Sequence, residues 1–153
     1  MSVTGKIPAV GIFLIVLQVL LGIGAVGGGA ALVIDPSGEL IGMPNRILAH
    51  SPFSSFFIPA IILFIILGIG PLTAAHGLAR RSDWSIMNRL NLFPDQHWAW
   101  AYSLYTGFAL IIWIALEVYF IQAVTGVHLF YLFYGLMIQA VTMLPAVQKY
   151  YSE

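Results

Sequence analysis

The stretch that decides the fold is Gly22–Pro59, which reads GIGAVGGGAALVIDPSGELIGMPNRILAHSPFSSFFIP. It begins inside a long glycine-rich apolar segment, crosses a polar loop with several prolines, and enters a second apolar segment at Pro59. Backbone exposed to lipid must be helical, because the hydrocarbon offers no hydrogen-bond partner to an irregular chain. The stretch therefore predicts two membrane-spanning helices joined by a loop outside the hydrocarbon.

The composition of the whole chain agrees with this prediction. Of 153 residues, 60% are hydrophobic and 8% are charged, whereas soluble domains carry about 25% charged residues. A small soluble domain exposes much of its surface and could not hide such an excess of apolar residues. The sequence predicts a single membrane domain over residues 1–153, with the lipid bilayer as its solvent.

Charge and cysteine content exclude several classes of function. The net charge is zero and the six cations are scattered, so no basic patch is available for phosphates and we expect no nucleic-acid partner. The chain has no cysteine, which excludes disulfides and thiolate metal sites. The GIGAVGGG run lies inside an apolar segment without a preceding strand, so it is not interpreted as a phosphate-binding loop.

The apolar segments predict an all-α membrane protein with four helices in an antiparallel bundle. The expected spans cover residues 7–33, 56–79, 98–124 and 128–147, with an external loop at 34–55 and a cytoplasmic linker at 80–97. The first segment exceeds the roughly 7–15 apolar residues of a signal peptide, so we interpret it as a retained span. The short connector at Thr125-Gly126 makes the last two helices antiparallel neighbours.

Breaks and short helices are expected between the spans. Asp35-Pro36-Ser37-Gly38 should end the first helix, and apolar residues at helical spacing predict a short interfacial helix over Met43–His50. The linker should form an amphipathic helix through Trp84, Met87 and Leu90, capped by Ser82 or Asp83.

Prolines and aromatic residues give further expectations for the spans. Pro71 should kink the second span, and Pro145 should bend or end the fourth. Trp98, Trp100 and Tyr102, with Tyr150 and Tyr151, are typical of an aromatic belt at a membrane surface.

The cations predict the orientation in the membrane. With four spans, five cations fall on the side of the termini, namely Lys6, Arg80, Arg81, Arg89 and Lys149. Only Arg46 falls on the opposite side. The positive-inside rule therefore predicts cytoplasmic termini and an external loop at 34–55 in the plasma membrane.

The motifs GGG, DPSG, GMP, SPF and IP, followed by LGIGPL and a tryptophan-led third span with a late glutamate, resemble an uncharacterised family of small bacterial four-span membrane proteins. The resemblance covers essentially the whole chain. It implies the size of the fold and a bacterial plasma-membrane location, but it implies no activity and assigns no functional residue.

Glu117 is the main candidate for a buried polar site, because ionisable residues inside membrane spans are costly and often functional. Its depth offers three candidate partners, which are His128 on the fourth span and Arg46 and His50 on the external loop. A Glu117–Arg46 pair would anchor the loop over the bundle. Alternatively, Glu117 lines an outward-facing cavity for a proton, a cation or a lipid or quinone head, or it extends to water.

The remaining candidates are interpreted mainly as structural. Gln18 and Gln139 are expected to make polar contacts between helices. Small residues allow close packing of helices or of two copies of the chain, and these are Gly22, Gly24, Gly28 and Gly29. The histidine pairs His50–His128 and His76–His97 have no diagnostic spacing for haem or metal, so we expect no metal and no cofactor.

Three classes of function remain open from the sequence. The first is a non-enzymatic accessory or interaction module that binds a membrane-protein partner, a second copy or a lipid. The second is a ligand-binding or transport subunit with a cavity around Glu117 for a hydrophobic or lipid ligand. The third is an intramembrane enzyme, although the sequence shows no catalytic motif. A dry core with Glu117 paired would favour the first class, and an open apolar cavity would favour the second.

Overall fold

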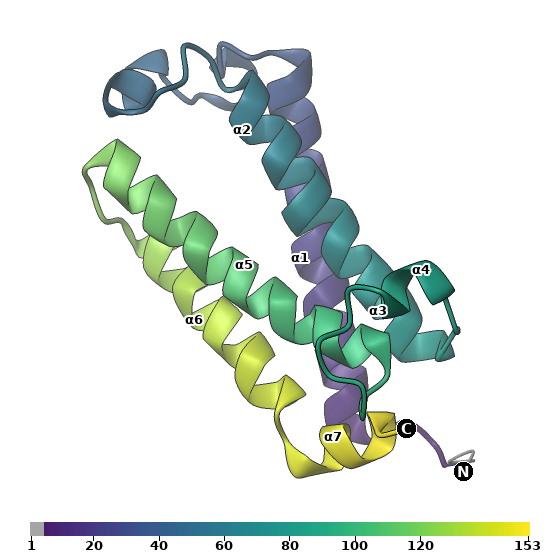
Figure 1. Cartoon of the computed structure of the whole chain (residues 1–153). Helices are drawn as coiled ribbons and strands as arrows, with labels where there is room; N and C mark the ends of the chain where they lie inside the picture. The colour runs from purple at the N-terminus through teal and green to yellow at the C-terminus, as the bar shows by residue number, and fades with distance from the viewer. Residues whose placement is uncertain (1–4) are drawn as a thin grey trace.

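A computed structural model describes residues 5–153 and shows an all-helical chain, 74% of which is helix (Figure 1). Among the described residues there is no β-strand. The helices, in order, are α1 (Ala9–Ile34), η1 (Glu39–Ile41), η2 (Asn45–His50), α2 (Phe57–Ile62), η3 (Leu63–Ile69), α3 (Gly70–Arg80), α4 (Ser85–Asn88), α5 (Trp98–Ile121), α6 (Gly126–Thr142) and α7 (Pro145–Tyr151). The predicted all-α fold is confirmed.

Three helical segments are long and apolar enough to cross a membrane, namely α1, the continuous run Phe57–Arg80 and α5. A fourth candidate is the pair α6 and α7, which is bent by 61° after Thr142. Many large apolar side chains on these helices face outward, including Leu20 and Ile23, each with 60% of its surface exposed. Such a surface is compatible with a membrane protein.

The helices form two hairpins, one from α1 with the run α2–η3–α3 and one from α5 with α6 (Figure 1). The hairpins contact each other through α3 and α5 and through α1 and α6. We call the end with residues 81–97 and 143–153 the termini end, and the end with residues 35–56 and 122–125 the loop end. In Figure 1 the hairpins converge at the termini end and diverge toward the loop end.

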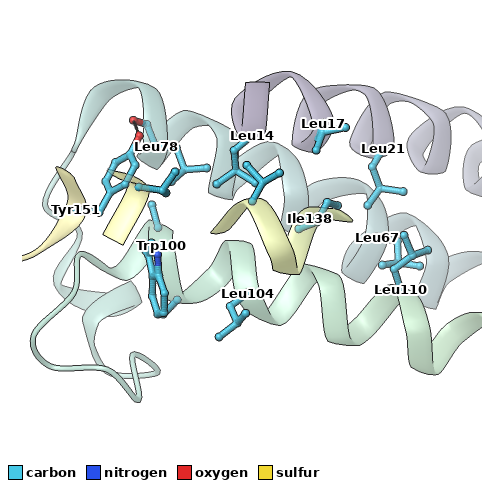
Figure 2. Close-up of a cluster of buried hydrophobic side chains, with 14 of the residues drawn as sticks. Leu14, Leu17, Leu21, Leu67, Leu78, Trp100, Leu104, Leu110, Ile138 and Tyr151 are labelled. Carbon is cyan, nitrogen blue, oxygen red and sulfur yellow. Dashed lines mark hydrogen bonds between the residues drawn. The ribbon is translucent and has the colours of Figure 1, made fainter. Parts of the chain in front are cut away.

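The main apolar core lies between the hairpins, from the middle of the molecule to the termini end (Figure 2). Leu14, Leu78 and Ile138 are fully buried there, together with Tyr151, whose hydroxyl donates to the Leu78 carbonyl at 2.6 Å. A second, smaller cluster around Leu32, Phe56 and Ala60 lies at the loop end. The chain therefore has two cores of unequal size, one toward each end.

Pro71 affects the second span in a different way from the expected kink. The seven residues before Gly70 form the π-helical segment η3, and the run Phe57–Arg80 continues through it as one helix. Proline lacks the N–H that an α-helix requires, and a wider turn accommodates the lost hydrogen bond. The distortion expected from Pro71 therefore takes the form of a π-helical segment within one continuous helix.

Several predicted boundaries and short helices need correction. The linker forms only the short helix α4, with Trp84 rather than Ser82 or Asp83 at its N-cap. The predicted interfacial helix at Met43–His50 is the 3₁₀ segment η2. The third helix ends at Ile121, because Gln122 adopts the left-handed conformation with φ 58° and terminates it.

The proposed aromatic belt is wrong for Trp98 and Trp100, which are 1% and 4% exposed. Their indole N–H groups donate to backbone carbonyls, Trp98 to Ser82 at 2.7 Å and Trp100 to Thr142 at 2.7 Å. A buried tryptophan needs a partner for its N–H, and these bonds fasten the linker and the end of α6 onto α5. Trp98 and Trp100 therefore connect elements inside the protein and do not form part of a belt at its surface.

The glycines of α1 separate into two faces. A Cβ added at Gly22 or Gly29 would approach the second span, coming within 2.6 Å of Leu72 and 2.9 Å of Phe64 respectively. These two positions therefore pack closely, as predicted. A Cβ at Gly24 would meet nothing within 4 Å, and one at Gly28 would meet only Leu63 at 4.0 Å. The predicted packing role of Gly24 and Gly28 is therefore wrong within this chain.

Candidate functional site

The loop end contains a cavity with two adjoining lobes between the hairpins. The first lobe has a volume of about 310 Å³ and the second about 530 Å³. The two lobes share part of their lining, and the residues common to both are Met43, Leu63, Trp113, Glu117 and Ile121. Each volume lies in the range of about 300–1,000 Å³ that is typical of small-molecule sites.

The lining of the cavity is mainly apolar and comes from both hairpins, including α2 and α6, and from the loop 35–56. The helix α1 supplies Gly24 and Gly28, whose missing side chains leave one wall free, and η3 supplies Leu63. The loop 35–56 covers the second lobe, and α5 closes the side opposite α1. The cavity therefore depends on all the elements that diverge at the loop end.

Glu117 and His128 form the polar centre of the cavity. The Glu117 carboxylate lies 4.0 Å from Nε2 of His128, and their side chains are 34% and 10% exposed. This separation exceeds the 2.7–3.2 Å of a hydrogen bond, so the two groups are neighbours without a direct bond. Glu117 borders both lobes while His128 borders the first, which places the carboxylate at their junction.

The surroundings of His128 determine which ring nitrogen carries the proton in its neutral form. The backbone N–H of Thr125 donates to Nδ1 of His128 at 3.0 Å, at the start of α6. Because Nδ1 accepts this bond, the neutral ring holds its proton on Nε2. His128 thus presents an N–H donor toward Glu117, and Glu117 presents acceptor oxygens to the cavity.

The structure does not form the proposed Glu117–Arg46 pair. Arg46 and His50 are exposed on η2, and within residues 5–153 the one ionic contact of Glu117 is with His128. Neither Arg46 nor His50 lines the cavity. The physical reason is that η2 turns its apolar residues Ile47 and Leu48 inward, which leaves its polar face toward solvent.

The loop 35–56 is an ordered cover for the second lobe. The Asp35 carboxylate accepts hydrogen bonds from the Ser37 hydroxyl at 2.6 Å and from the Leu40 N–H at 2.8 Å, and these bonds lower the pKa of Asp35. Gly38 has a φ of 83° and lies so close to Met43 and Phe56 that a Cβ has no room. The sequence motif DPSG therefore fixes the turn that starts the cover.

The cover also rests on the other hairpin. Phe53 packs edge-on against Phe120 of α5, with ring centroids 6.5 Å apart. Ile47 and Leu48 pack on the small core around Phe56. The contact between Phe53 and Phe120 bridges the cover and the second hairpin beside the second lobe.

Gln18 and Gln139 are both buried, but they do not bond to each other. Gln18 Nε2 donates to the Ser103 hydroxyl at 2.8 Å, and Ser103 is bonded to Thr142 at 2.9 Å. The network joins α1, α5 and α6 on the side of the bundle toward the termini end. Gln139 instead packs on Gly107, so the predicted interhelical polar contact is present only for Gln18.

The other histidines do not form a metal site. Among residues 5–153, no group of three or more His, Cys, Asp or Glu residues is placed to hold a metal ion. His76 stacks on Trp84 with ring centroids 5.5 Å apart, and His97 caps α5 by accepting from Ala99. Their positions at the termini end suit packing and capping.

Trp113 belongs to the site, although its sequence position was not predicted to be there. It borders both lobes beside Glu117, and its position one helical turn before Glu117 was the available signal. Met43 and Leu63 were missed as well, because nothing in their local sequence distinguishes a cavity wall from a packed core.

Comparisons with protein-family models, curated proteins and solved structures find no match to this chain.

Proposed function

We propose that this chain is an integral membrane protein that binds a hydrophobic ligand in the cavity at its loop end. The apolar, span-length helices and their outward-facing apolar side chains support a bilayer location. Four crossings, with α6 and α7 as a bent fourth span, agree with this composition. The small bacterial four-span proteins that the sequence resembles would have the same size and location.

The proposed orientation places the termini end in the cytoplasm. Arg80, Arg81 and Lys149 lie toward the termini end, whereas Arg46 lies on the loop 35–56, and cations favour the cytoplasmic side. A reporter enzyme that works only in the cytoplasm should be active when it is fused after Glu153. A reporter that works only outside the cytoplasm should be active when it is inserted after Asn45. Activity in the reverse pattern would overturn the orientation without affecting the ligand site.

The observation that carries the ligand proposal is the position of Glu117, at the junction of two largely apolar lobes. Apolar pockets with a few convergent polar groups are the usual form of a ligand site. An ionisable side chain that served only as an anchor would be expected to have a close partner. The Glu117 carboxylate instead lies 4.0 Å from His128, and 34% of the surface of its side chain is exposed.

The cavity favours a ligand-binding protein over an accessory module that acts through helix contacts alone. The open face of α1 at Gly24 and Gly28 borders the cavity rather than a neighbouring helix. The close-packed glycines, Gly22 and Gly29, are already used within the chain.

Filling the cavity tests the proposal directly. A leucine at Gly28 would extend into the second lobe. Gly27 lies on the same helix but lines neither lobe, and a Cβ added there meets nothing within 4 Å. After purification in mild detergent, mass spectrometry should detect a copurifying amphiphile in the wild type and in Gly27→Leu. Gly28→Leu should lose this amphiphile. Equal retention by all three proteins would contradict binding in this cavity.

A further inference from the structure

The charge of the cavity restricts the head group that a ligand can carry. Among the described residues that line the two lobes, Glu117 is the only aspartate, glutamate, lysine or arginine. A phosphate or carboxylate head would meet this carboxylate with no lysine or arginine in the lining to offset the repulsion. The lining thus disfavours anionic lipids in spite of its suitable volume.

The second restriction comes from the incomplete pairing of Glu117. Its neighbour His128 uses Nδ1 to accept from Thr125 and presents Nε2–H at 4.0 Å, beyond hydrogen-bond distance. A carboxylate in apolar surroundings is costly unless a cation or several donors compensate it. No lysine or arginine lines either lobe, and a positively charged ligand head would supply the missing cation.

The third restriction is the aromatic wall beside the carboxylate. Trp113 borders both lobes next to Glu117, and Tyr131 borders the first lobe next to His128. Aromatic faces attract ammonium groups through cation–π interactions, with tryptophan the strongest. Carboxylate and aromatic ring together form a setting that suits an alkylammonium group and also tolerates the apolar chain attached to it.

We infer that the cavity binds a cationic amphiphile, with an alkylammonium head between Glu117 and Trp113 and an apolar chain in the second lobe. This inference rests on the proposed function of the cavity as a ligand site. The second lobe suits the chain because Ile62, Leu116 and Phe120 line it, and Ser51 and Glu117 are its main polar groups. The head is then held at the junction of the lobes.

The test compares three brominated probes of equal chain length, a fatty amine, a fatty alcohol and a fatty acid, with the protein reconstituted in uncharged lipid vesicles. Bromine quenches tryptophan fluorescence on contact, and Trp113 is the tryptophan that lines the cavity. The quenching that is absent in Trp113→Phe reports binding there. The amine should bind about tenfold more tightly than the alcohol, and the acid should bind most weakly.

A matched pair of variants assigns the preference to Glu117. Glu117→Gln should abolish the advantage of the amine, whereas Glu39→Gln removes an exposed carboxylate at the same end of the molecule and should preserve it. If Glu117→Gln does not fold, the ranking of the three probes on the wild type still decides the inference. Equal binding of all heads, or strongest binding of the acid, would overturn it and leave the ligand site intact. Quenching of Trp113 by none of the probes would overturn the ligand site itself.

Discussion

The termini end and the loop end are built from the same helices but differ in how they are filled. At the termini end, indole, hydroxyl and guanidinium groups bond to backbone carbonyls across elements, as Trp98 does to Ser82, Tyr151 to Leu78 and Arg81 to Tyr150. At the loop end, the hairpins diverge around lobes of about 310 and 530 Å³. A bundle closed at one end can hold a cavity at the other without losing its fold.

If the bundle lies in lipid, as proposed, the difference also indicates which kind of contact closes it. Apolar side chains gain little by leaving lipid for the protein interior, so packing and polar bonds between helices must hold them together. The termini end has both, including the stack of His76, Trp84 and Trp98. The loop end relies on the cover 35–56 and its contact between Phe53 and Phe120.

The largest expected contrast is between two tryptophans on the same helix. Trp98→Ala should lower the free energy of unfolding by about 3–5 kcal/mol, because it leaves a cavity among fully buried neighbours. Trp113→Ala should cost less, about 1–2 kcal/mol, because its half-buried ring already borders an open lobe on one side. Thermal unfolding of both variants in one nonionic detergent measures the difference. Equal losses would mean that the loop end is as tightly packed as the termini end.

A smaller contrast is expected between two glycines. A Cβ at Gly77 would clash with the Trp98 ring and lie 2.6 Å from Ala99, whereas one at Gly24 meets nothing within 4 Å. Gly77→Ala should destabilise by about 1–3 kcal/mol through overpacking. Gly24→Ala should be neutral or stabilise by about 0.5–1 kcal/mol, since alanine is the better helix former. A destabilising Gly24→Ala would show that this face of α1 is packed.

The polar network should contribute less than the packing. Ser103→Ala removes the 2.8 Å partner of Gln18 and the link to Thr142, and should cost about 1 kcal/mol. Ser55→Ala at the loop end removes only a 3.4 Å bond to the Phe57 N–H, and its effect should be within about 0.5 kcal/mol. The two melting curves in the same detergent give the comparison. A larger loss of stability in Ser55→Ala than in Ser103→Ala would mean that the stabilising polar bonds lie at the loop end.

The smallest effect expected is a difference in acid sensitivity. Burial lowers the pKa of His97 below 6.5, with Glu153 opposing and Arg81 adding to the shift. A lowered histidine pKa means that the unfolded chain binds the proton more readily, so stability is lost as the pH falls below 6.5 toward the folded value. The melting temperature of the wild type should therefore fall in this range. His97→Asn keeps a cap for α5 and should flatten the curve.

Asp35 provides the matching test at the loop end. Its lowered pKa means that its contribution is present above 3.8 and is lost only as the pH falls further, through the folded value. Hydrogen exchange in residues 36–42 should therefore stay protected at pH values where residues 81–97 already open. Simultaneous opening of both segments would show that the two ends unfold as one unit.

Much of the fold could be predicted from the sequence, because long apolar runs have few alternatives to helices. The segments 98–124 and 128–147 contain α5 and most of α6, and Pro145 begins α7 after the 61° bend. Short elements were harder to predict. The helix α4 covers only Ser85–Asn88. The spacing of Trp84, Met87 and Leu90 predicted a longer helix, but Trp84 stacks on Trp98 from the N-cap position of α4.

The site could be predicted only in part. Glu117 was identifiable, since a lone carboxylate in an apolar run is costly wherever it lies, and His128 was among its candidate partners. The choice of His128 over Arg46 depended on the rotation of η2, which turns its apolar side inward. Likewise, Gly24 and Gly28 look like a packing motif until the divergence of the hairpins is known.

The sequence by itself determined that this chain is helical and apolar, where its long helices lie, and that Glu117 is exceptional. These properties follow from local composition, because each helix satisfies its own backbone hydrogen bonds. Only the tertiary structure decided that Trp98 and Trp100 point inward and that the loop end is hollow around Glu117. Packing between helices depends on which faces meet, and many faces of these apolar helices are nearly equivalent in sequence.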